Sequence, residues 1–331
     1  MPEKFDNPKL NLLRTLVHDY LKFLTKVRKL SLLTIKAYRD DLNWFIENIH
    51  IFYKNNNAFP PLSQNFMRFL VLNMRRNNLS SRSISRKLSS IRNFFNWILK
   101  NDVEELTNVL QSNPMLNVKG PKLLSLLPKA LTVDETINFL DSKRKQMKSW
   151  IDFRDNAIFE LIYSSGLRVS EVAKIDIKKT KASFGWIDFD SSQIEIMGKG
   201  SHWRIIPIGN FAMKSVKEWI KYREILVENK SLTSNQAALF LNNKGMRISV
   251  RTIQRRFEIH SRNTKSNLSV SPHMLRHSFA SHILQSSGNL RAIQELLGHS
   301  KISTTQIYTR LDHQHLSKIY DKTHPRAKLN S

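Results

Sequence analysis

The stretch FGWIDFDSSQIEIMGKGSHWRIIP, residues 184–207, decides the fold class of this chain. It holds three runs of alternating apolar and polar residues, at 184–189, 193–197 and 203–207, with short polar turns between them. Alternation with a period of two predicts strands with one buried face, and turns this short join antiparallel neighbours. The sequence on both sides favours helices. We therefore expect a mainly α protein with one small antiparallel β-sheet, which makes the second half an α+β domain.

The helices are predicted from apolar residues at helical spacing and from capping residues. Ser31 is suited to cap the second helix, and Thr132 with Glu135 forms a capping box before another. The expected helices are 13–27, 31–45, 62–76, 83–100, 132–142, 152–164, 212–229, 250–260, 272–286, 290–297, 303–311 and 315–320.

Two domains are expected, because single cores rarely grow beyond about 250–300 residues and the chain has 331. Proline and glycine gather at 114–128, among several lysines, which is typical of a linker. We predict a helical domain at 9–108, a basic Pro-rich linker at 109–128, a second domain at 129–322 and a C-terminal tail at 323–331.

The charge of the chain indicates its class of partner. With 53 Lys and Arg against 27 Asp and Glu, the net charge is +26. Such a charge favours polyanions, whether DNA, RNA or an anionic membrane. Charge alone leaves open a basic protein that binds nucleic acid without any enzymatic activity.

Several classes are disfavoured by what the sequence lacks. No apolar run approaches the roughly 18–20 residues of a membrane span, and no signal peptide opens the sequence. We expect a cytoplasmic, nucleoid-associated protein with no membrane insertion. The absence of cysteine excludes disulfides and thiolate zinc sites.

One helix of the first domain offers a candidate DNA-binding face. Guanidiniums and short hydrogen-bonding groups alternate along the polar side of 83–100, at Arg82, Arg86, Ser89 and Asn93. Such a face suits phosphates and groove edges. An ordinary solvated face is an equal reading of the same pattern.

In the second domain, cations stand in settings that suit phosphate binding. Arg168 follows a glycine break at a helix start, and a guanidinium can donate two hydrogen bonds to one phosphate. Ser271-Pro272 starts a helix on which His273 and Arg276 share one face near its positive end. Lys199 lies between two glycines in a strand turn, where it could protonate a departing alkoxide. For any one of these residues alone, a solvated surface role is the better reading.

A hydroxyl that could attack the phosphate stands near the C-terminus. His299 follows Leu297-Gly298, and nine residues later Tyr308 falls in the second turn of the helix expected from Ser303. A phenol with a pKa of about 10 is a weak nucleophile and needs positioning, proton removal and cations around the phosphorus.

Together these motifs resemble the tyrosine site-specific recombinases. Gly-Leu-Arg168-Val-Ser-Glu171, Met-Gly-Lys199-Gly, His273-x-x-Arg276-His, Leu-Leu-Gly-His299 and Ser-Thr-Thr-Gln-Ile-Tyr308 each look like that family's motifs. The tail, including His324-Pro-Arg-Ala327, is most similar to the family's Xer branch. Two departures are the residues at 201–204, where the family usually has a charged turn, and the first fifty residues, which match mainly in pattern.

The resemblance implies a fold and a set of roles. The fold is a two-domain C-shaped DNA clamp, with an N-terminal helical SAM-like core-binding domain and a catalytic domain. Tyr308 would attack the scissile phosphate to give a 3′-phosphotyrosine. Arg168 and Arg276 would hold the nonbridging oxygens, and Lys199 would protonate the leaving 5′-oxygen. His273 would assist proton transfer, His299 would hydrogen-bond the phosphate, and Glu171 would orient its neighbours.

The resemblance also implies partners. No cofactor, metal or ATP would be needed, because one phosphoester replaces another. Double-stranded DNA carrying a recombination site would be the substrate. A XerD-like recombinase would join in a heterotetrameric synapse that resolves chromosome dimers before cell division, with a septal DNA translocase nearby. The segment after Leu311 would pack onto a neighbouring protomer.

Three other functions stay open at this point. A phage, plasmid or integron integrase would use the same chemistry on a different site. A catalytically silent DNA-binding protein would not need all six chemical positions filled. A metal-dependent transposase would need clustered carboxylates, and no convincing set is found.

Overall fold

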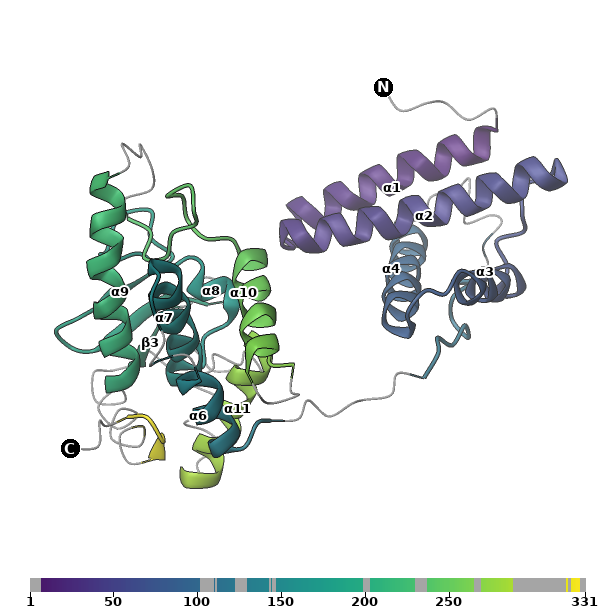
Figure 1. Cartoon of the computed structure of the whole chain (residues 1–331). Helices are drawn as coiled ribbons and strands as arrows, with labels where there is room; N and C mark the ends of the chain where they lie inside the picture. The colour runs from purple at the N-terminus through teal and green to yellow at the C-terminus, as the bar shows by residue number, and fades with distance from the viewer. Residues whose placement is uncertain are drawn as a thin grey trace. The chain divides into compact units, whose positions relative to one another are not determined.

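The computed structural model describes residues 7–101, 110, 112–122, 130–142, 144, 147–198, 203–229, 237–264, 269–287, 320 and 323–327. The chain divides into two compact units, Met1–Ser125 and Leu126–Ser331, and each is described by itself (Figure 1).

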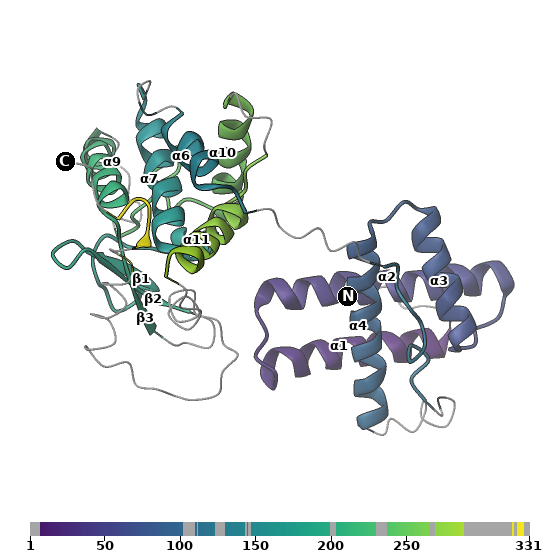
Figure 2. The same ribbon diagram turned by 90° about the horizontal axis from the view of Figure 1, so that it is seen from below.

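The first unit is built from helices that begin at side-chain caps. These are α1 (Pro8–Lys26), α2 (Leu32–Asn56), α3 (Gln64–Arg76) and α4 (Ser81–Lys100), capped by Asn7, Ser31, Ser63 and Ser80 respectively. Each capping oxygen accepts one of the backbone N–H groups that a first turn leaves without a partner. Helices α1 and α2 lie side by side, and α4 crosses them (Figure 2).

The core of the first unit combines aliphatic side chains with several aromatic ones. Phe45, Phe94 and Phe95 are completely buried, and Tyr20 packs against Phe94. The short segment after α4 adds to this core through Leu110, Met115 and Val118. Arg92 fixes that segment by donating to the carbonyls of Met115 and Val118. Part of the stretch expected to be linker therefore packs on the first unit.

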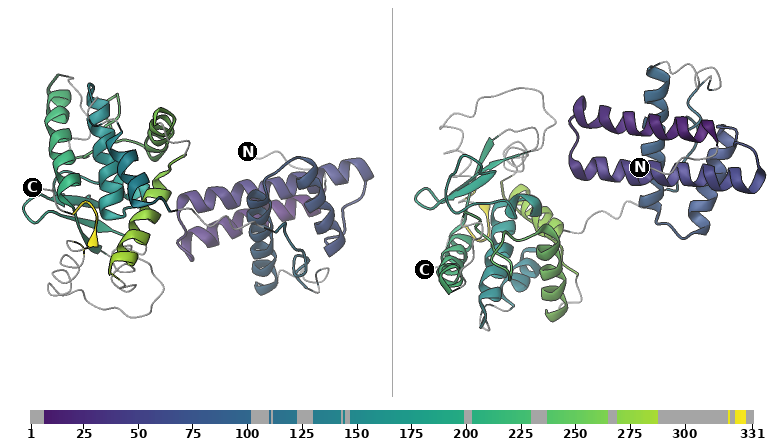
Figure 3. Two further views of the ribbon diagram at one scale, coloured as in Figure 1. Left: turned by 60° about the horizontal axis from the view of Figure 1, so that its bottom comes forward. Right: turned by 90° about the horizontal axis from the view of Figure 1, so that it is seen from above.

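The second unit is arranged around one buried helix. Helix α7 (Trp150–Ser165) is buried at every position from Arg154 to Ser165. Around it lie α6 (Val133–Asp141), α8 (Val169–Val172), α9 (Asn210–Asn229), α10 (Val250–Asn263) and α11 (Pro272–Ser287) (Figure 3). Capping boxes start α6 at Thr132 and α7 at Ser149. A helix that is buried on all sides needs such surroundings.

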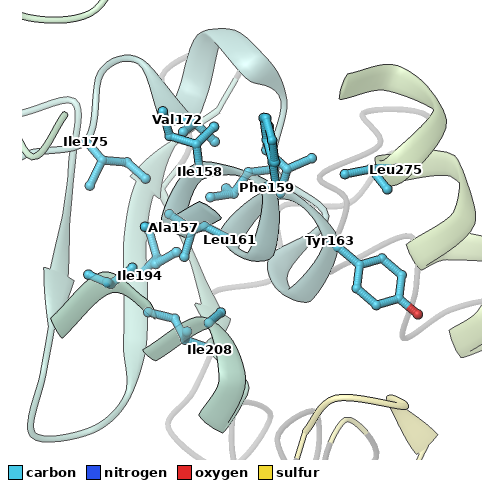
Figure 4. Close-up of a cluster of buried hydrophobic side chains, with 14 of the residues drawn as sticks. Ala157, Ile158, Phe159, Leu161, Tyr163, Val172, Ile175, Ile194, Ile208 and Leu275 are labelled. Carbon is cyan, nitrogen blue, oxygen red and sulfur yellow. The ribbon is translucent and has the colours of Figure 1, made fainter. Parts of the chain in front are cut away.

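The expected sheet is present. Strands β1 (Gly185–Asp188), β2 (Gln193–Met197) and β3 (Trp203–Pro207) form an antiparallel sheet in the order β1-β2-β3. Ile194 of β2 pairs with Ile206 of β3, and both are completely buried. Figure 4 shows Ile194 and Ile208 beside α7, while Leu275 of α11 lies on the other side of that helix.

Most of the predicted elements are confirmed, and most bounds differ by a few residues. The second helix, expected at 31–45, continues to Asn56, and for the short helix α8 only the start near Arg168 was predicted. The expected helices 290–297 and 303–311 lie outside the described residues, as does nearly all of 315–320. No described helix is long and apolar enough to cross a membrane.

The described residues near the C-terminus lie against α7 of their own unit. The Tyr320 hydroxyl is 2.6 Å from the Ser164 hydroxyl. Arg326 donates to Glu160 at 2.5 Å and pairs with Asp141 at 3.1 Å. Most of the segment after Leu311, which was expected to pack onto a neighbouring protomer, lies outside the described residues, so that expectation stays a prediction.

Candidate active site

The corner between α7 and α8 positions the first arginine. Gly166 ends α7 in the left-handed conformation, with φ of 56°, which glycine adopts without steric cost. Arg168 then stands at the N-cap of α8, as expected, with its side chain 38% exposed. Its backbone N–H donates to Glu171 Oε2 at 2.7 Å, and its Nη1 donates to Oε1 at 3.0 Å. The carboxylate thereby fixes both the corner and the direction of the guanidinium.

The start of α11 brings the second arginine to the same place. Pro272 occupies the first helical position, and the Ser271 hydroxyl accepts from the backbone N–H of Met274 at 3.3 Å. One turn further, Arg276 is 8% exposed and donates to the Gly166 carbonyl across 110 residues of sequence. This hydrogen bond joins α11 to the corner that carries Arg168.

Glu171 is the hub of the site. Besides Arg168, it accepts from Arg204 Nη2 of β3 at 2.9 Å, and Arg276 Nη1 lies 3.9 Å from Oε2. Burial alone would raise the pKa of the Glu171 carboxyl, but hydrogen bonds and charges from Arg204 and Arg168 hold it below its usual range. The carboxylate is ionised, and three guanidiniums surround it.

The surplus of cations is visible in Arg276. Burial, followed by the charges of Arg168 and Arg204, lowers the pKa of its guanidinium to about 10, although Glu171 acts in the opposite direction. Arg276 is therefore still protonated at neutral pH. One carboxylate against three guanidiniums leaves positive charge for an incoming anion.

The two arginines Arg168 and Arg276 border an open cleft of about 720 Å³. Arg168, Ser170, His273 and Arg276 line it, facing Gln254 and Glu258 of α10. His273 is exposed and stands in the first turn of α11, at the positive end of the helix. A helix N-terminus with two guanidiniums beside it suits a phosphate.

Of the residues predicted for catalysis, the structure brings together Arg168, His273, Arg276 and Glu171. Lys199, His299 and Tyr308 lie outside the described residues, so their positions stay predictions. Arg204 was not among the predicted site residues. The sequence pattern that could have identified Arg204 is a charged residue on the same strand face as Ile206, where the alternation predicts an apolar residue.

The predicted DNA-binding face of α4 is exposed at all four positions, Arg82, Arg86, Ser89 and Asn93. Two of them have partners within the first unit. Arg86 pairs at 2.6 Å with Asp41, whose side chain is completely buried, and Asn93 donates to the Tyr38 hydroxyl at 3.0 Å. These two side chains are preorganised on the surface.

Among the described residues, no cluster of three or more His, Cys, Asp or Glu is placed to hold a metal ion.

Two family models cover most of the chain. Residues 129–315 match the phage integrase family, and residues 17–102 match the phage integrase N-terminal SAM-like domain. The chain belongs to the phage integrase family. It is a site-specific tyrosine recombinase, made of a SAM-like N-terminal domain and a catalytic domain.

Full-length relatives in this family are XerC proteins. Tyrosine recombinase XerC of Chromobacterium violaceum is 42% identical over 295 residues, covering 89% of this chain and 90% of the relative. Tyrosine recombinase XerC of Escherichia coli O1:K1 is 38% identical over 317 residues, covering 96% and 98%. The predicted resemblance is confirmed.

A solved structure supports the fold. XerH site-specific recombinase bound to difH substrate, in a pre-cleavage complex, superimposes with a TM-score of 0.68. It covers 95% of this chain and 97% of that one, at 21% sequence identity. At this identity the likeness concerns the fold, which is the expected mainly helical one with a small antiparallel sheet.

Proposed function

We propose that this recombinase cuts and rejoins double-stranded DNA at a specific site through a 3′-phosphotyrosine on Tyr308. Arg168 and Arg276 hold the nonbridging oxygens of the scissile phosphate. Lys199 protonates the leaving 5′-oxygen. His273 assists proton transfer, and His299 hydrogen-bonds the phosphate.

The observation that carries the proposal is the cluster of guanidiniums beside the α11 N-terminus. Arg276 is charged and nearly buried, and Arg168 is held by Glu171 while 38% exposed. Charge develops on the phosphorus oxygens in the transition state, and preorganised cations stabilise it without reorganising. The same cluster would raise the acidity of a phenol brought close to it.

The assignment of partners goes one step further. DNA is the proposed substrate, since the net charge is +26 and the related XerH structure contains a difH substrate. We assign DNA contacts to the helical unit, through the α4 face, and catalysis to residues 129–322. A XerD-like recombinase completes a heterotetramer that resolves chromosome dimers in the cytoplasm before cell division, in contact with a septal DNA translocase.

The test is covalent capture on a nicked suicide substrate, in which release of a short fragment prevents religation. Tyr308→Phe should bind the labelled site with unchanged affinity and form no protein–DNA adduct, because the attacking oxygen is missing. Arg276→Ala should form the adduct about 10²–10³-fold more slowly, the usual cost of removing one preorganised donor. An adduct formed by Tyr308→Phe would disprove the assignment of the nucleophile.

Two further arms of that experiment separate the alternatives. Cleavage that survives a chelator and needs no nucleotide is expected, and loss of cleavage with the chelator would favour metal-dependent chemistry. Candidate chromosomal sites are offered with and without a XerD-like partner. Exchange that needs only a mobile-element attachment site would point to an integrase role.

A further inference from the structure

Arg204 occupies a position where packing does not explain a charge. It lies on β3 in register with Ile196 of β2, on the same face as Ile206, and is 9% exposed. Its Nη2 donates to Glu171, while Nε and Nη1 are buried without a hydrogen-bond partner in the described part of the chain. A guanidinium with one bonded nitrogen among the described residues is costly to bury, and an apolar side chain would pack there at lower cost.

The surroundings of Glu171 Oε2 indicate a role for the positive charge of Arg204. This oxygen accepts from the Arg168 backbone N–H at 2.7 Å and from Arg204 Nη2 at 2.9 Å. Arg276 Nη1 is 3.9 Å away, beyond hydrogen-bond distance but close enough to become a direct partner after a small movement. Arg204 and Arg276 therefore compete for one carboxylate oxygen.

We propose that Arg204 is a positioning residue for strand cleavage, which holds Glu171 away from Arg276 so that this arginine stays available to the phosphate. Without Arg204, Oε2 loses a charged partner while Arg276 Nη1 lies 3.9 Å away, and a buried carboxylate that loses one partner is destabilised unless another replaces it. An ion pair between Glu171 and Arg276 would then offset the charge of the Arg276 guanidinium, which cleavage needs. The inference rests on the proposed role of Arg276 and adds a residue to it.

The experiment is a double-mutant cycle on the full chain, read as the single-turnover rate of adduct formation. Arg204→Met removes the charge and keeps the volume. It should slow capture by about 10–100-fold, the range typical of residues that orient an active-site group without touching the substrate. The affinity for the uncleaved site should stay unchanged. Arg204→Lys should recover part of the rate because it keeps a cation beside Glu171.

The decisive variant is Glu171→Gln. It is expected to be slow by itself, since Arg168 loses its ion pair. Because a neutral amide does not pair with Arg276, adding Arg204→Met to it should change the rate by less than about 2-fold, a strong non-additivity. Additive losses would overturn the inference by showing that Arg204 acts independently of Glu171, and so would a wild-type rate for Arg204→Met.

Controls separate this effect from folding and from the proposed function. Arg154 is another buried arginine, 1% exposed and paired with Asp155 near the start of α7. Arg154→Met should lower the thermal midpoint without slowing capture per folded molecule. If it slows capture as much as Arg204→Met does, the Arg204 effect is a general loss of structure.

If Arg276→Ala captures at the wild-type rate, the phosphate role of Arg276 fails and the inference falls with it. If Arg276→Ala is slow and the cycle is additive, only the Arg204 inference falls.

Discussion

At the scale of the residue, Glu160 is a buried ionisable group outside the active site whose pKa is strongly shifted. It lies on α7, completely buried, with Oε1 on Arg326 at 2.5 Å and Oε2 without a partner among the described residues. Burial raises the pKa of its carboxyl to about 7, because the charges of Arg326 and Arg144 offset only part of the lost hydration.

This shift predicts how stability varies with pH. The folded protein keeps a proton that the unfolded chain releases, so the contribution of Glu160 is complete below pH 4.5 and is lost as pH rises through about 7. The loss is on the order of 3 kcal/mol, at about 1.4 kcal/mol per pKa unit. Glu160→Gln should therefore flatten the decline in unfolding free energy between pH 5 and 8, measured by urea titration.

The control is Glu228→Gln, which changes an exposed carboxylate on α9. Its stability profile should follow that of the unchanged protein. A Glu160→Gln profile with the original slope would show that this carboxylate is not the source of the decline.

At the scale of the element, the end of α7 sets the geometry of the site. Gly166 combines a left-handed backbone with a carbonyl that accepts from Arg276, and the next turn begins at Arg168. The break therefore determines both the direction of α8 and the anchor for α11.

A side chain at position 166 should be costly. Gly166→Ala places a Cβ in the left-handed region, which costs about 1–2 kcal/mol, and Asn tolerates this region better than Ala. Chemical denaturation should give a larger loss of stability for Gly166→Ala than for Gly166→Asn. Equal losses would mean that the backbone conformation is not what limits this position.

Elements with local signals could be predicted from the sequence, and contacts between distant segments could not. Ser31, Thr132 and the pair Ser271-Pro272 act on the residues directly after them, so the helix starts were visible. The hydrogen bond from Arg204 to Glu171 joins residues that are 33 positions apart, so no local signal predicts it. A single sequence shows that a charge falls on a buried strand face but does not name its partner. The pairing of buried Asp41 with Arg86, 45 residues away, could not be predicted for the same reason.

At the scale of the whole molecule, the net charge of +26 makes binding to DNA an ion-exchange process. Each phosphate contact releases counterions, so the affinity falls with salt along a line whose slope counts the contacts. Within the first unit, Arg82 and Arg86 differ in the charge that they add, because Asp41, which Arg86 shares with Lys87, offsets part of the charge of Arg86.

The difference gives a prediction for the α4 face. Arg82→Ala should weaken binding to all sequences alike and reduce the slope of log K against log salt by about one. Arg86→Ala should reduce it by less. Fluorescence anisotropy from about 50 to 200 mM salt measures both slopes, and Arg82→Lys, which keeps the charge, should leave the slope unchanged. An unaltered slope in Arg82→Ala would remove that residue from the interface.

Tyr320 and Arg326 are buried against α7, and these contacts have a mechanical consequence. Both α11 and the described C-terminal residues contact α7, the latter through the Tyr320–Ser164 and Arg326–Glu160 hydrogen bonds. Ser164 is two residues before Gly166, so the Tyr320 contact ends close to the corner that carries Arg168. A change that loosens this anchorage should therefore disturb the corner as well as the C-terminal residues.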